Sequence, residues 1–106
     1  MRTAAPSPFL PTVVKLTTDA REAVAAEMFT IEAVRLAVTK AATAGKARLF
    51  LRPPLPLDLQ KTAAAKALIE HLAALGLATF WHPYAIEDGG RQETGYELEV
   101  SWHGRE

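Results

Sequence analysis

The chain has 106 residues, 49% hydrophobic and 23% charged, a composition typical of one globular domain with a modest core. Twelve basic and twelve acidic side chains give a formal net charge of zero, so no broad field of charge attracts nucleic acid or anionic lipid. The absence of cysteine excludes disulfides, thiolate catalysis and cysteine-ligated zinc. Because no apolar run reaches about 18 residues, we expect no membrane span, and we predict a cytoplasmic protein, in the host cytoplasm or virion if viral.

Residues 1–16 combine three prolines with apolar side chains, which predicts an extended N-terminal arm before a single domain at residues 17–106. Proline favours extended backbone, yet the stretch is too apolar for a solvated linker. We therefore expect the arm to bind a surface, either on its own domain or on a partner. Its candidate contact residues are Phe9, Leu10, Val13 and Val14.

A long helix is predicted from about residue 20 to residue 44. Asp19 and Glu22 have the spacing of a capping box, and Gly45 ends the pattern. One apolar stripe faces the core, whereas Phe29 and Leu36 project from the other side. A helix with two apolar sides needs a second neighbour, which is either the arm or another chain.

An alternative for this stretch is a break at Thr30. Thr30 then caps a second helix, and Phe29 and Val34 take the positions of a hydrophobic staple across its first turn. We favour the continuous helix over this alternative.

A second helix is predicted to begin at Asp58, which follows three prolines and has a side chain suited to capping free N–H groups. Gly76 ends it by supplying a left-handed residue, and Leu77 then folds back onto the last turn. The core-facing side of this helix is apolar and comprises Ala64, Ala65, Leu68, Ile69, Leu72 and Leu75.

Three strands are predicted at residues 47–52, 78–82 and 96–102. The last has the clearest alternation, with Leu98 and Val100 on one face and Glu97 and Glu99 on the other. Residues 85–94 contain Asp-Gly-Gly and are predicted to form a polar turn too long for a tight hairpin.

These elements predict an α+β fold, a two-layer α/β sandwich in which a long N-terminal helix precedes a β-α-β-β unit. We expect the first two strands to be parallel through a crossover, in a three-stranded mixed sheet of order 1-3-2 with the helices on one face. The order follows from charge, because Arg48 and Arg52 of the first strand can face Glu97 and Glu99 of the last.

The open face of this sheet is the second candidate surface. Phe50 points there between Arg48 and Arg52, and one of Phe80 and Trp81 joins it, because adjacent strand residues face opposite ways. Aromatic rings with arginine are typical of protein interfaces. They also occur in sheets that bind single-stranded nucleic acid, but Glu97 and Glu99 on the same face disfavour that alternative. Equally, the rings can pack under the arm or the C-terminal tail.

The sequence carries no recognisable catalytic motif. Its three histidines, His71, His82 and His103, lack metal-ligand spacing, and the glycine pair at residues 89–90 lacks the context of a phosphate loop. We therefore predict no enzyme, no cofactor and no metal site.

A resemblance supports the same view. The chain has Ala-Arg-Glu at residues 20–22, Gly45 after a long helix, Gly76-Leu77 after a second, and Ser101-Trp102 in the last strand. This layout resembles small uncharacterised bacteriophage proteins over residues 19–102, although Leu77 replaces a more usual aromatic residue. The resemblance brings no catalytic residues and implies a virion component or accessory protein. Our hypothesis is a non-enzymatic interaction module that binds another protein or copies of itself, including by homo-oligomer or capsid assembly.

Overall fold

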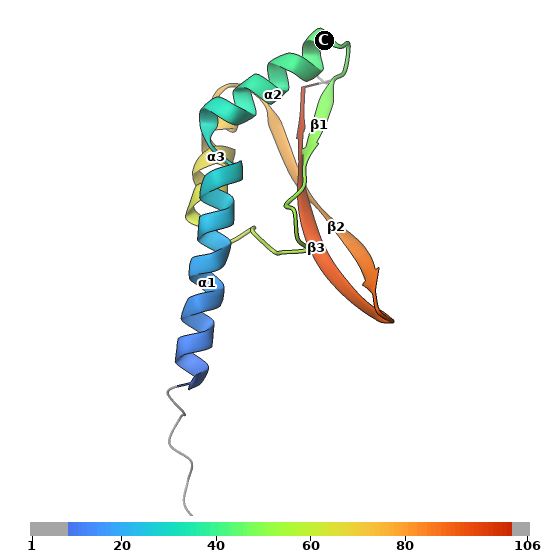
Figure 1. The fold of residues 1–106 in the computed structure, drawn as a ribbon. Helices are drawn as coiled ribbons and strands as arrows, with labels where there is room; N and C mark the ends of the chain where they lie inside the picture. The colour runs from blue at the N-terminus through green and yellow to red at the C-terminus, as the bar shows by residue number, and fades with distance from the viewer. Residues whose placement is uncertain (1–8, 103–106) are drawn as a thin grey trace, which may run out of the picture.

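The computed structural model describes residues 9–102, which form a helical layer against one face of a sheet (Figure 1). The helices are α1 (Phe9–Met28), α2 (Ile31–Thr43) and α3 (Ala63–Ala74), and the strands are β1 (Arg48–Leu51), β2 (Ala78–Asp88) and β3 (Arg91–Ser101). The predicted α+β class, the two layers and the placement of the helices on one face are confirmed. Residues 1–8 of the expected arm and His103 lie outside the described residues.

Helix α1 begins at Phe9, so the prediction of extended backbone is wrong for residues 9–16. Pro11 lies in the first turn of the helix, where a backbone N–H has no acceptor within the helix and its loss costs little. The expected capping box is also absent. Asp19 lies in mid-helix and binds Lys15 at 2.8 Å instead.

The predicted continuous helix is wrong, and the alternative with a break at Thr30 is confirmed. Thr30 has extended backbone, and its hydroxyl oxygen accepts a hydrogen bond from the Ala33 N–H at 3.3 Å. Phe29 and Val34 flank this cap and are both buried in the core. Because of the break, the two helices have different neighbours: α2 packs on β1, and α1 packs on α3.

Helix α3 begins at Ala63 instead of Asp58. The Asp58 carboxylate accepts hydrogen bonds from the backbone and side-chain amides of Gln60 and closes a turn before the helix. Thr62 is the N-cap, and its hydroxyl oxygen accepts from the Ala65 N–H at 3.3 Å. The first helical N–H, that of Ala63, donates to the carboxylate of Glu22 on α1 at 2.9 and 3.1 Å.

The predicted end of α3 is confirmed at Gly76, which has a φ of 87°. The Leu77 N–H donates to the Leu72 carbonyl at 2.9 Å, as expected for a chain that folds back on the last turn. Leu75 was expected in the core but is half exposed. It is the C-cap of α3 and lies beyond Leu68 and Leu72, which are the leucines of this helix that reach the core.

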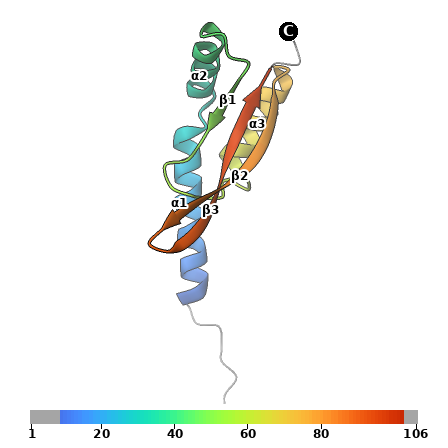
Figure 2. The same cartoon turned by 90° about the vertical axis from the view of Figure 1, so that its right-hand side faces the viewer.

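The sheet has the predicted order β1-β3-β2, but every neighbouring pair is antiparallel, so the prediction of a mixed sheet is wrong (Figure 2). β1 and β2 run in the same direction, as the crossover predicts, but they do not pair with each other. β3 lies between them and follows β2 through a tight turn, which makes it antiparallel to both.

The turn between β2 and β3 is a two-residue hairpin at Gly89 and Gly90, both with positive φ. The expected long polar turn is therefore wrong, because residues 85–88 and 91–94 continue the two strands. Paired positive φ values match the right-handed twist of the flanking strands, and glycine adopts them without strain. Pro83 is tolerated within β2 because this strand is an edge of the sheet.

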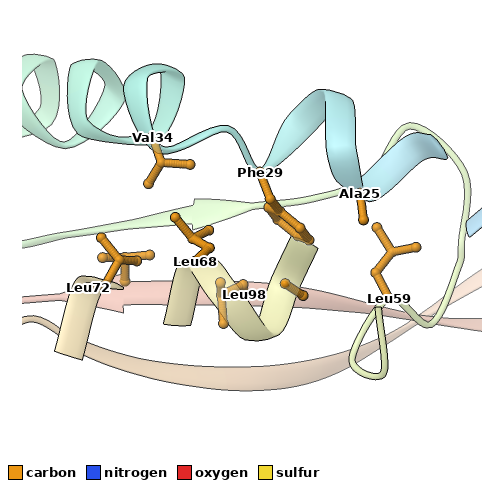
Figure 3. Packing of buried hydrophobic residues seen from close by; sticks show 9 residues of the cluster. Ala25, Phe29, Val34, Leu59, Leu68, Leu72 and Leu98 are labelled. Carbon is orange, nitrogen blue, oxygen red and sulfur yellow. The ribbon is translucent and has the colours of Figure 1, made fainter. Parts of the chain in front are cut away.

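The core lies between the helices and the inner face of the sheet (Figure 3). Phe29 and Val34 from the helix break point toward Leu68 and Leu72 of α3 and toward Leu98 of β3. Burial of such side chains contributes roughly 1.5–3 kcal/mol each. Burial of Phe29 and Val34 therefore stabilises the break between α1 and α2.

Residues 52–62 connect β1 to α3, and Pro56 and Leu57 of this segment lie against β3. The Tyr96 N–H donates to the Leu57 carbonyl at 3.1 Å, and Leu59 is fully buried. Gly95 is buried beneath this segment, where a Cβ atom would lie 2.7 Å from the Pro56 Cα and from the Tyr84 ring. Only glycine allows the backbone to approach so closely at this point.

Candidate interaction surfaces

The open face of the sheet collects most of the residues predicted from the strands. Arg48, Phe50 and Arg52 point outward from the β1 segment, as the alternation predicts, and Phe80 joins them from β2. Phe80 is 63% exposed, and Phe50 is 47% exposed. The choice between Phe80 and Trp81 is thereby resolved in favour of Phe80.

Trp81 is turned toward the helices and packs against the core, so its candidacy as a surface residue is wrong. Its ring meets the Phe29 ring edge-on at a centroid distance of 6.1 Å. Phe29 is only 3% exposed, which likewise removes it from the surface. Leu36 on α2 is exposed, but it does not share a surface with Phe29 because the helix is broken between them.

The charges on the open face are paired as predicted. Arg52 contacts Glu97 at 3.2 Å, and Arg48 contacts Glu99 at 3.8 Å. The hydrogen bonds to Glu97 raise the pKa of Arg52 above its ordinary value. The Arg52 guanidinium also lies 4.2 Å from the centroid of the Tyr84 ring, a cation–π geometry.

Glu99 is the centre of this face. In the strand register it lies between Phe50 of β1 and Phe80 of β2. His82 follows Phe80 on the same face, its Nε2 is 2.5 Å from the Glu99 carboxylate, and its ring lies 4.7 Å from Phe80 and 5.7 Å from Phe50. The open face therefore has the Phe50 and Phe80 rings on either side of Glu99. The Glu99 carboxylate already contacts Arg48 and His82 of the same chain.

His82 and Tyr84 are the residues of this face that the sequence reasoning missed. Phe80, His82 and Tyr84 alternate along β2, which continues to Asp88, beyond the predicted end of this strand at residue 82. Pro83 and the Asp-Gly-Gly sequence at residues 88–90 are typical of a loop, although here they lie in a strand and a tight turn.

The other candidate surface is the N-terminal half of α1. In Figure 1 this half extends past α3 and away from the β2–β3 hairpin. Phe9, Leu10 and Val14 from the predicted arm are exposed, Val13 is half-buried, and Leu16 adds an exposed leucine that was not selected from the sequence. The arm residues thus lie together, on a helix and not on an extended chain.

The described residues contain no cluster of three or more acidic or histidine side chains that could hold a metal ion. None of the helices within residues 9–102 is long and apolar enough to cross a membrane. Comparison with known protein families, curated proteins and solved structures finds no match to this chain.

Proposed function

We propose that this protein is a non-enzymatic interaction module, a bacteriophage structural or accessory protein that assembles through the N-terminal half of α1. The observation that carries the proposal is the exposure of Leu10, Val14 and Leu16, which are 62%, 55% and 61% exposed on a helix segment that leaves the domain. The resemblance in layout to small phage proteins supports a virion or accessory role.

The need of this helix segment for packing of its apolar side chains supports the same proposal. This segment extends a 20-residue helix whose other half packs on α3, and most helix stability comes from packing of an apolar face. The Lys15–Asp19 ion pair is exposed and adds little. A partner that covers the leucines supplies the missing packing, and in a structural assembly the first partner to test is another copy of the chain.

Light scattering of the full chain tests this proposal. We expect a mass that is a multiple of the 11.5 kDa monomer and that falls on dilution. Leu16→Glu should shift the protein to the monomer, because a charge replaces an apolar contact. Leu55→Glu is the matched control, because Leu55 is also 61% exposed but lies in the loop before α3, and it should leave the mass unchanged.

A monomeric mass at every concentration would contradict assembly through α1. Equal effects of Leu16→Glu and Leu55→Glu would also contradict it, since they would indicate a general effect on solubility and not a local contact.

A second candidate function is binding of single-stranded nucleic acid to the open face. It is favoured by Phe50 and Phe80, two exposed rings in the same row of the sheet, because bases stack on such rings. The carboxylates that already bind Arg48 and Arg52 oppose it. A labelled oligonucleotide at low salt should bind the wild type and not Phe50→Ala, and no binding at low salt removes this candidate.

A further inference from the structure

The outer edge of β1 has backbone groups directed away from the sheet. The Trp102 N–H donates to the Ala47 carbonyl at 2.9 Å, so residues 47, 49 and 51 direct their backbone groups toward β3. The alternating residues Arg48 and Phe50 therefore direct their N–H and C=O groups to the outside. β1 is an edge strand, and such an edge can pair with a further strand.

A groove follows this edge. It has a volume of about 580 Å³ and is lined by Ala41 of α2, by Lys46 and Ala47 before the strand, and by residues 48–50. Its helical side is small and apolar at Ala41, and Leu49 faces the same side. The groove can therefore accept side chains of a strand added at this edge.

The charge along the edge is positive. Lys46 and Arg48 line the groove, and the Arg48 side chain is 60% exposed although it already contacts one carboxylate. A second copy of β1 added in antiparallel fashion would place arginines against arginines, which is unfavourable. An acidic strand is favoured at the same position.

The chain itself shows what β1 binds. On its inner edge β1 pairs with Glu97-Leu98-Glu99 of β3, whose leucine enters the core while the glutamates contact Arg52 and Arg48. Of the two arginines, Arg48 lines the groove at the outer edge, whereas the Arg52 guanidinium is directed toward Glu97 of β3 and the Tyr84 ring of β2.

We propose that the outer edge of β1 binds an extended acidic peptide segment by strand addition, with its carboxylates beside Lys46 and Arg48 and an alternate apolar side chain toward α2. The site is independent of the α1 surface. The partner at this site is a different, acidic chain. In strand addition the backbone hydrogen bonds provide affinity, and alternate side chains provide specificity.

A synthetic peptide with the sequence of residues 96–101, Tyr-Glu-Leu-Glu-Val-Ser, is the direct probe. Its binding to the full chain is measured by fluorescence anisotropy and compared with that of the peptide carrying glutamine in place of both glutamates. We expect the glutamine peptide to bind more weakly, and Arg48→Gln to lower affinity for the acidic peptide by about two- to fivefold, the effect of an exposed ion pair. Arg35→Gln on α2, which is exposed outside the groove, is the control and should not change affinity.

A second test of strand addition changes only the peptide and leaves the protein as it is. N-methylation of alternate peptide amides removes the donors of one peptide edge, and N-methylation of the other set removes those of the opposite edge. One set should abolish binding and the other should be tolerated, because a strand pairs with β1 through one edge.

Equal binding of the two N-methylated peptides would overturn the proposal, as would equal binding of the glutamate and glutamine peptides. Displacement of the peptide by a single-stranded oligonucleotide at the same concentration would also overturn it, in favour of a general site for anions. Leu16→Glu should leave peptide binding unchanged, so failure of the α1 proposal and failure of this one are distinguishable.

Discussion

Replacement of Phe29 by alanine is the most severe test of the helix break. Phe29 is 3% exposed, meets the Trp81 ring edge-on, and lies in the same core as Val34 and Leu68. Truncation of a buried phenylalanine costs about 3–5 kcal/mol through lost burial and the cavity left behind. Domains of this size have a total stability of about 5–15 kcal/mol, so Phe29→Ala should remove a large part of it.

The assay is urea unfolding followed by tryptophan fluorescence, with Leu36→Ala as the control. Leu36 is 56% exposed on α2, and its truncation should change the free energy of unfolding by no more than about 0.5 kcal/mol. If Phe29→Ala does not fold, Phe29→Leu keeps most of the volume and should lose about 1 kcal/mol with the ring contact. Equal, small effects of Phe29→Ala and Leu36→Ala would refute the break and restore a continuous helix with two outward apolar residues.

Two further predictions concern contacts between distant segments. Gly95→Ala should lower the free energy of unfolding by about 1–3 kcal/mol in urea titration, because the added Cβ meets the Pro56 backbone and the Tyr84 ring at 2.7 Å, whereas Thr94→Ala on the exposed neighbour should have little effect. Glu22→Gln should cost about 0.3–1 kcal/mol, less at high salt, because the carboxylate charge at the N-terminus of α3 is lost. Glu27→Gln on the same helix is its control, and equal losses for the two variants would contradict a specific cap.

The strands were the more predictable half of the fold. The alternation around Leu98 and Val100 identifies the buried face of β3, and the match of Glu97 and Glu99 with the two arginines is sufficient to order the sheet. Both features can be predicted from the sequence. Side chains alternate between the two faces of a strand, and opposite charges attract each other across neighbouring strands.

The helix boundaries were less predictable because similar residues have different roles. Pro11 is compatible both with an extended arm and with the first turn of a helix, and Asp58 is compatible both with a cap and with a separate turn. The role of Glu22, which binds the start of a helix 41 positions further along the chain, depends on the tertiary fold. For the same reason the contact between the Phe29 and Trp81 rings could not be predicted from local pattern.

We propose that another copy of the chain covers the N-terminal half of α1. Amide hydrogen exchange of residues 9–20, measured at several protein concentrations, tests it most directly. Assembly through α1 should give protection that rises with concentration in this segment, while protection in α3 stays constant. Rapid exchange of residues 9–20 at every concentration, with α3 protected throughout, would contradict it.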